Sequence, residues 1–138
     1  IIPLPCTEST FGGLSNGLCR KPHGIKYYMT LSGYMEHCDK LATCVVNQLI
    51  QMRASGYQFL CVLGVENSPS CAVKHIYSNC GTLTRKGIFF DLLDEKLTCN
   101  GFTIPFVGVL RRQNSPAAYA QLEELLKAWE STKKDDDS

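Results

Sequence analysis

The sequence has no apolar run that reaches the roughly 18 residues of a membrane-spanning helix, which disfavours a membrane protein. Neither sign of charge is in excess, because 14 Lys and Arg residues balance 13 Asp and Glu residues and leave a formal net charge of +1. We therefore expect neither a nucleic-acid partner nor a membrane-surface partner. The start, Ile1–Pro5, lacks the basic region of a signal peptide.

Several sequence motifs that mark common sites are also missing. None of the eight cysteines forms a C-x-x-C pair, which excludes a zinc ribbon, a thioredoxin-type motif and a local ferredoxin-type run. No cysteine is followed by arginine at the spacing of a phosphatase loop, and no G-x-x-x-x-G-K-[ST] phosphate loop is present. Any metal site must therefore combine residues that lie far apart in the sequence.

What is present is an ordinary globular composition of 138 residues, 44% of them apolar and 20% charged. This length predicts a single domain, which we place over residues 1–132, followed by a frayed polar tail over 133–138. Cys44 and Cys61 occupy apolar periodic positions, where a free thiol behaves as a small hydrophobe and is expected to be buried and inert. Unpaired buried thiols favour a reducing, cytoplasmic location.

The hydrophobic pattern predicts strands and helices in alternation. Strands are expected over Ile1–Leu4, Phe59–Val65 and Phe102–Leu110, the last weakened by Pro105. The expected helices carry apolar stripes: Leu41, Cys44, Val45, Leu49 and Met52, with Gln48 as the one polar member; Ile88, Phe89, Leu92 and Leu93; and Leu122, Leu125, Leu126 and Trp129. The segment before Lys86 has no clear pattern. The order predicts an α/β domain, with a single-layer, mostly parallel sheet flanked by helices in a Rossmann-like three-layer architecture.

In such sheets ligands bind at the carboxyl ends of the strands, so the residues that follow each strand are the candidates for a site. The first strand delivers Cys6 and Glu8, the second delivers Ser68, Ser70 and Cys71, and the third delivers Arg111 and Arg112. Two thiols from different loops suit a metal half-site, a redox pair, or a nucleophile with its resolving partner. They also suit two incidental buried cysteines. Cys38 could reach the same edge or lie in the core.

A family resemblance is carried by two of these loops. The stretch Gly64–Cys71, which reads GVENSPSC, resembles the Ser-Pro-Ser-Cys signature of the thiouracil desulfidase (TudS) family. Cys6-Thr7-Glu8 followed by Gly12-Gly13-Leu14 is similar to that family's Cys-Pro-Glu and Gly-Gly-Leu, with Thr7 in place of proline. The stretch Tyr34–Cys38 is similar to a cysteine-bearing helix start in a short subgroup of TudS-related proteins.

The resemblance implies an enzyme that removes sulfur from a thiolated nucleobase or similar small thio-compound by means of a [4Fe–4S] cluster. It implies Cys6 and Cys71 as cluster ligands, and Glu8 and Ser68 as residues for proton transfer or substrate positioning. The family's first ligand lies on a strand upstream of the Cys-Pro-Glu loop, which this sequence does not contain, so either that ligand has been lost or Cys38 supplies the third thiolate. Two alternatives stay open: a non-catalytic metal- or small-ligand-binding domain, and a metal-free thiol enzyme that uses Cys6 or Cys71.

Overall fold

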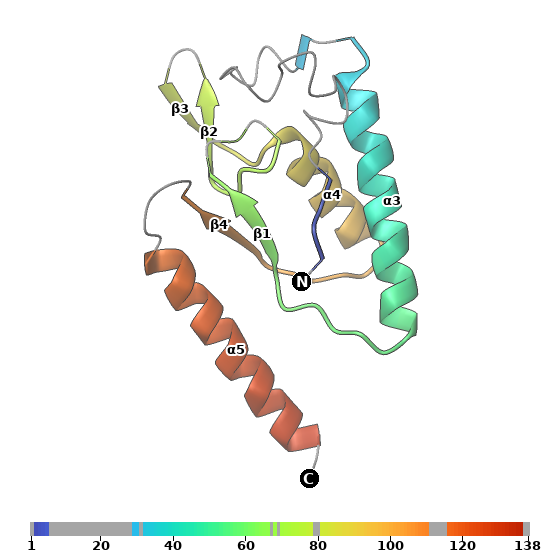
Figure 1. Cartoon of the computed structure of the whole chain (residues 1–138), viewed down its shortest axis with the longest axis vertical. Helices are drawn as coiled ribbons and strands as arrows, with labels where there is room; N and C mark the ends of the chain where they lie inside the picture. The colour runs from blue at the N-terminus through green and yellow to red at the C-terminus, as the bar shows by residue number, and fades with distance from the viewer. Residues whose placement is uncertain are drawn as a thin grey trace.

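The structure, a computed structural model, describes residues 2–5, 29–30, 32–66, 68, 70–78, 81–110 and 116–136. These residues form a mixed α/β arrangement (Figure 1). The elements follow one another as α3 (Tyr34–Ala54), β1 (Val62–Val65), β2 (His75–Ser78), β3 (Gly81–Thr84), α4 (Ile88–Cys99), β4 (Phe106–Val109) and α5 (Pro116–Asp136). Among the described residues no helix is apolar over a length sufficient to cross a membrane.

A pair of parallel strands lies at the centre of the fold. β1 and β4 pair from Val62 opposite Phe106 to Val65 opposite Val109. Pro105 lies just before β4 and contributes only its carbonyl, which accepts a hydrogen bond of 2.8 Å from the backbone nitrogen of Val62. Proline therefore precedes the strand without interrupting it. The α/β class is confirmed, with a parallel sheet of two strands in the described part of the chain.

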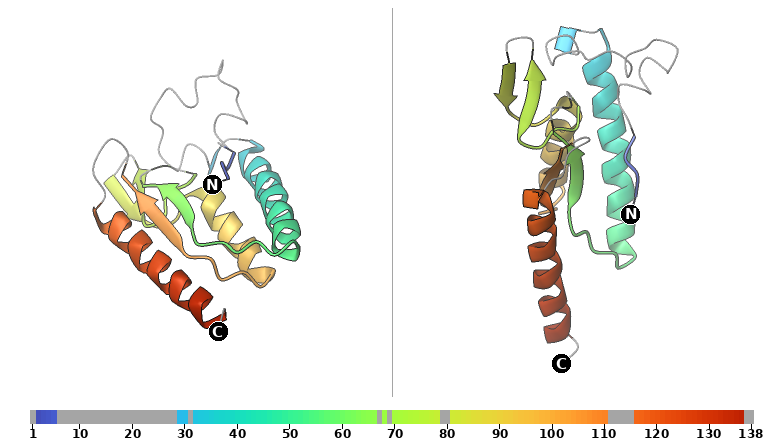
Figure 2. Two further views of the ribbon diagram at one scale, coloured as in Figure 1. Left: turned by 60° about the horizontal axis from the view of Figure 1, so that its bottom comes forward. Right: turned by 60° about the vertical axis from the view of Figure 1, so that its left-hand side comes forward.

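Helices lie on both sides of this strand pair. α3 and α4 pack against each other on one side, and α5 lies along the other side, against β4 (Figures 1 and 2). The side of α3 and α4 holds the main core, where the rings of Phe90 and Phe106 meet edge to face with centroids 5.2 Å apart. Parallel strands need such cover because a parallel sheet exposes apolar side chains on both faces.

The buried face of α3 differs from the predicted stripe. The residues that point into the core are Tyr34, Cys38, Ala42, Val45, Val46 and Leu49. Cys44 is exposed, so the prediction that it is buried is wrong. Val45 and Leu49 belong to both stripes, but the large ring of Tyr34 and the small side chains of Cys38 and Ala42 rotate the buried face away from Cys44.

The predicted strand over Ile1–Leu4 is not formed in its described part, since residues 2–5 have no strand structure. The reason is that Pro3 and Pro5 lack the N–H groups that a strand uses to pair with a neighbour. These residues instead run beside β1 and α3 (Figure 1). Leu4 packs against the core.

The segment without a clear pattern contains an antiparallel hairpin. β2 and β3 pair from His75 opposite Thr84 to Ser78 opposite Gly81. Ile76 is fully buried in the core. The signal for these strands was the run of β-branched and aromatic residues in His75–Ser78 and Gly81–Thr84, which is typical of strands.

α5 is longer and less buried than predicted. It continues to Asp136, past the expected tail boundary at 133. Leu126 and Trp129 are exposed, so the predicted stripe is not a buried one. The helix rests on the strand pair through its first turn, where Ala118 is buried.

The two paired strands are buried to different extents. Val107 of β4 is fully buried, whereas its partner Leu63 on β1 stays 49% exposed.

Candidate functional site: the Cys71 loop and its pocket

A tight loop follows the carboxyl end of β1 and carries Cys71. The chain turns back so that the backbone nitrogen of Val65 donates a 3.0 Å hydrogen bond to the carbonyl of Cys71. The backbone nitrogen of Ala72 donates to the carbonyl of Ser68 at 3.3 Å. These bonds fix Cys71 at the end of the strand, where α/β folds place their ligands.

The hydroxyl of Ser68 is the centre of this loop. Its oxygen accepts from the backbone nitrogen of Cys71 at 3.3 Å and from the Cys71 thiol at 3.2 Å. It also lies 3.4 Å from the backbone nitrogen of Ser70, which donates to it, and 3.3 Å from the Ser70 hydroxyl. A serine that accepts from backbone groups a few residues ahead stabilises a turn in place of a helix or strand. Ser68 therefore orients the Cys71 sulfur.

The loop packs so closely against its neighbours that two positions admit only glycine. A Cβ atom at Gly64 of β1 would clash with the carbonyl oxygen of Cys71 and lie 2.5 Å from the ring of Phe90. A Cβ atom at Gly87 would clash with the carbonyl of Ser70 and lie 2.6 Å from the backbone nitrogen of Cys71. The loop is therefore clamped between β1 and the start of α4.

The same loop caps α4. Gly87, at the N-cap position, provides no side-chain cap, but the backbone nitrogen of Phe90 donates a 3.0 Å hydrogen bond to the carbonyl of Ser70. The backbone nitrogen of Gly87 donates to the carbonyl of Ala72 at 2.9 Å. Because the first N–H groups of a helix need outside partners, the Cys71 loop and α4 stabilise each other.

Glu66 is a structural residue of the site that the sequence analysis missed. Its carboxylate oxygen Oε1 accepts hydrogen bonds from the backbone nitrogens of Val73 at 2.7 Å and Lys74 at 3.0 Å. Charge-assisted bonds of this kind are stronger than neutral ones. The carboxylate thus joins the two ends of the loop. A carboxylate directly after an apolar strand and before a Ser-x-Ser turn was the available signal.

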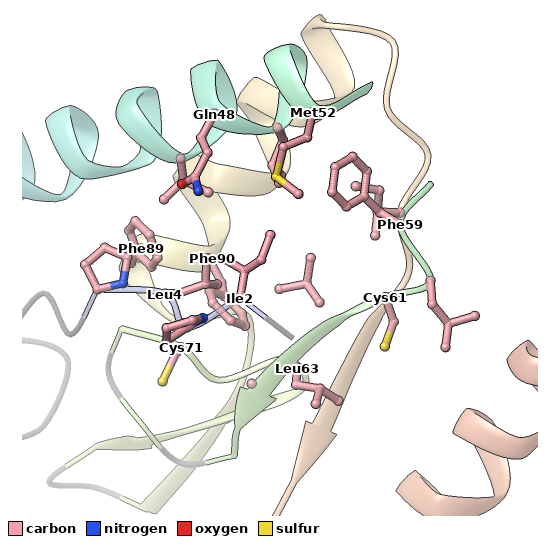
Figure 3. A pocket seen from close by; sticks show the side chains of 18 of the residues that line it. Ile2, Leu4, Gln48, Met52, Phe59, Cys61, Leu63, Cys71, Phe89 and Phe90 are labelled. Atoms are coloured by element: carbon pink, nitrogen blue, oxygen red, sulfur yellow. The ribbon is translucent and has the colours of Figure 1, made fainter. Parts of the chain in front are cut away.

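A pocket of about 840 Å³ lies beside the loop (Figure 3). Its walls come from residues 2–5, α3, the approach to β1, and α4, and they are mostly apolar. The residues labelled in Figure 3 are Ile2, Leu4, Gln48, Met52, Phe59, Cys61, Leu63, Cys71, Phe89 and Phe90. Ser70 and Cys71 contribute polar groups from the loop, Gln48 contributes one from α3, and Tyr57 and Gln58 contribute others from the segment before β1. A mostly apolar cavity with a few polar groups is typical of a small-molecule site.

Two of the predicted site residues, Ser68 and Cys71, are in direct contact through the hydroxyl and the sulfur. Cys38 lies in the interior of α3 and is 0% exposed, and Cys71 packs against the same core cluster. Cys6 and Glu8 lie outside the described residues, as do Arg111 and Arg112. Among the residues that the structure describes, no group of three or more His, Cys, Asp or Glu side chains is arranged to hold a metal ion.

The remaining described cysteines lie in different environments. Cys99, like Cys44, is exposed. Cys61 is partly buried on the wall of the pocket, and this burial raises the pKa of its thiol. The prediction that Cys61 is buried is thus confirmed only in part, because Cys61 is not fully enclosed.

Comparison with known proteins gives no relative for this chain. No protein-family description, no curated protein and no solved structure matches it.

Proposed function

We propose that this chain is a [4Fe–4S]-dependent desulfidase that removes sulfur from a thiolated nucleobase or similar small thio-compound. The observation that carries the proposal is the Cys71 loop: a thiol held by Ser68 at the carboxyl end of a parallel strand, on the wall of an apolar pocket. The loop lies in the stretch GVENSPSC that resembles the desulfidase signature.

The cysteines suit an iron–sulfur cluster in their chemistry, because thiolate sulfur is the ligand that such clusters prefer. Cys71 and Cys38 adjoin one apolar cluster, and we propose Cys6 as the third ligand. An iron left without a protein ligand would supply a Lewis acid that binds soft sulfur.

The chain's own residues have separate roles in this proposal. Ser68 would orient the Cys71 sulfur through its 3.2 Å contact. The apolar walls would keep bulk water, other than the one molecule that reacts, away from the thio-compound and so strengthen polar interactions inside the pocket. Glu8, two residues after Cys6, would give a proton to the base and take one from the water molecule whose oxygen replaces the sulfur, so that a carbon–oxygen bond forms as the carbon–sulfur bond breaks and sulfide is released.

Two further expectations belong to the same proposal. The parallel pair β1 and β4, with helices on both sides, supports a Rossmann-like three-layer architecture for the whole domain. Such a cluster enzyme would work in the reducing cytoplasm, where cysteines remain as thiols.

The test is purification without oxygen, followed by measurement of iron, visible absorption and release of sulfide from 2-thiouracil. We expect about four iron atoms per chain and a brown colour, which are typical of a [4Fe–4S] protein. Cys71→Ala, Cys38→Ala and Cys6→Ala should each lose iron. Cys44→Ala is the matched control, since Cys44 is exposed on the same helix as Cys38 and should keep it.

A protein that binds no iron after anaerobic reconstitution would contradict the proposal. Turnover of 2-thiouracil by the iron-free protein would also contradict it, and would favour a metal-free thiol enzyme.

A second function, a non-catalytic small-ligand-binding domain, is favoured by one observation. Cys38 is enclosed in the core in the manner of a packing residue, at 0% exposure. The non-catalytic assignment would be the better one if Cys38→Ala keeps its iron and Cys71→Ala binds ligands with the same affinity as the unaltered protein.

A further inference from the structure

Gln48 is the one polar residue that α3 contributes to the wall of the pocket. It is exposed and lies beside the buried face of the helix, next to Val45 and Leu49. Val45, Leu49 and Met52, which neighbour Gln48 on the helix, line the same pocket. Gln48 therefore places a hydrogen-bonding group on a wall that is otherwise apolar.

The amide of Gln48 points from α3 toward the strand side of the pocket (Figure 3). Gln48 is exposed and makes no hydrogen bond to the part of the chain that the structure describes. A glutamine amide offers an oxygen acceptor and an NH₂ donor side by side. Both remain available to a molecule in the pocket.

The other walls indicate what kind of molecule fits. Phe59 supplies partly exposed aromatic surface, and Leu4 and Met52 supply aliphatic surface; the rings of Phe89 and Phe90 also border the pocket but are almost fully buried. Aromatic side chains favour flat rings, which stack against them or meet their edges. A ligand that also satisfies Gln48 must carry a donor next to an acceptor on its own edge.

We propose that Gln48 determines ligand specificity in this pocket by pairing with an N–H group next to a C=O or C=S group on a planar heterocycle. For a heterocycle that carries C=S, the inference rests on the proposed function. For a heterocycle that carries C=O, it rests on the pocket alone. The amide would accept from the ring N–H and donate to the adjacent oxygen or sulfur. This pairing would orient the ring relative to Cys71.

The test uses two ligands that cannot be desulfurised, so it does not depend on a working cluster. Uracil has the N–H and C=O edge, and 1,3-dimethyluracil has the same ring with both N–H groups replaced. Their dissociation constants are measured by calorimetry for the unaltered protein, for Gln48→Met and for Gln51→Met. The methionine variants keep the length of the side chain and remove only its polar end.

We expect Gln48→Met to weaken uracil binding roughly tenfold, as the loss of hydrogen bonds worth about 1.4 kcal/mol would do. Binding of 1,3-dimethyluracil should change less than about twofold, since that ligand lacks the donor. Gln51→Met is the matched control, because Gln51 is exposed on α3 and does not line the pocket. It should leave both constants unchanged.

Three results would overturn the inference. These are an absence of uracil binding at millimolar concentration, an equal loss for both ligands in Gln48→Met, and a loss in Gln51→Met as large as that in Gln48→Met. Failure of the desulfidase proposal is recognised separately, by iron content and sulfide release. A protein without iron that still shows the Gln48-dependent preference would retain the inference and lose the enzyme assignment.

Discussion

The hydroxyl oxygen of Ser68 lies 3.2 Å from the sulfur of Cys71 and 3.3 Å from the backbone nitrogen of the same residue. One side chain thus fixes both the position of the Cys71 backbone and the direction of its thiol. Because the two groups converge on one oxygen, a change at Ser68 affects sulfur and loop together.

Ser68→Ala should therefore destabilise the fold by about 1–2 kcal/mol, since the backbone donors at Ser70 and Cys71 lose their acceptor. The same variant should let iodoacetamide react faster with Cys71, which lines an open pocket and loses its hydrogen-bond partner. Urea unfolding and mass spectrometry of the alkylated residue measure the two effects.

Ser55→Ala is the control for Ser68→Ala. Its hydroxyl also bonds to a backbone group, the carbonyl of Gln51, but at the exposed end of α3. It should change stability by less than about 0.5 kcal/mol. An equal loss in both variants would show that Ser68 has no special place in the loop.

Gly64→Ala should be among the most damaging single substitutions in β1. The added methyl group would meet the carbonyl oxygen of Cys71 and the ring of Phe90, neither of which is the flexible end of a side chain. Overpacking of this kind costs about 1–3 kcal/mol or more. The midpoint of urea unfolding should fall accordingly.

Gly56→Ala separates this steric effect from the general cost of replacing glycine. Gly56 has no atom within 4 Å of the added group, but its φ of +95° is unfavourable for alanine. The expected cost is about 1 kcal/mol. If Gly56→Ala proves as costly as Gly64→Ala, the close approach between β1 and the Cys71 loop would be refuted.

Glu66→Ala should destabilise the protein by about 2 kcal/mol, because the backbone nitrogens of Val73 and Lys74 lose a charged acceptor. Glu66→Gln keeps an oxygen at the same place and should recover part of the loss. Glu95→Ala, on the exposed face of α4, serves as the reference and should be near neutral in thermal unfolding.

The thiol of Cys61 should lower the free energy of unfolding in alkaline solution. Burial raises the pKa of Cys61, so the folded state holds this proton to a higher pH than the unfolded state does. The contribution of the protonated thiol to the free energy of unfolding is fully present below the pKa that Cys61 has in the unfolded state. It is lost as the pH rises through the pKa that Cys61 has in the folded state. Compared with Cys61→Ala, the unaltered protein should lose more stability above the ordinary thiol pKa of about 8.5. Identical pH profiles for the two proteins would disprove this.

Glu8→Gln should keep iron bound and lower the rate of sulfide release by about 10²–10⁴, the usual contribution of a general acid or base. Glutamine preserves the shape of the side chain but cannot supply a proton. Iron content and turnover are measured on the same anaerobic sample. Full turnover by this variant would remove Glu8 from the proposed mechanism.

The sequence was most informative where one pattern dominated. The apolar run that ends in Gly64-Val65 and the helix that begins at Ile88 both appear at the expected places. The loop that carries Cys71 follows β1 as expected, because the loop after a strand is fixed by the order of the elements.

Elsewhere two readings competed, and tertiary packing decided between them. On α3 the choice between Cys38 and Cys44 depended on Tyr34 and Ala42, which a simple hydrophobic pattern undervalues. At the N-terminus two prolines outweighed the apolar residues around them. Contacts such as those from Glu66 to Val73 and Lys74 depend on the turn itself, which residue types alone do not determine.

The clamping of the Cys71 loop between Gly64 and Gly87 links the chemistry of one sulfur to the cooperativity of the whole domain. The loop reaches its conformation only when β1 and the start of α4, which lie more than twenty positions apart in the sequence, have docked around it. Local fluctuations of surface segments leave such a site intact, whereas global unfolding disrupts it completely. The orientation of Cys71 is therefore a property of the complete fold, and the protection of its thiol against alkylation should disappear and return in step with folding itself.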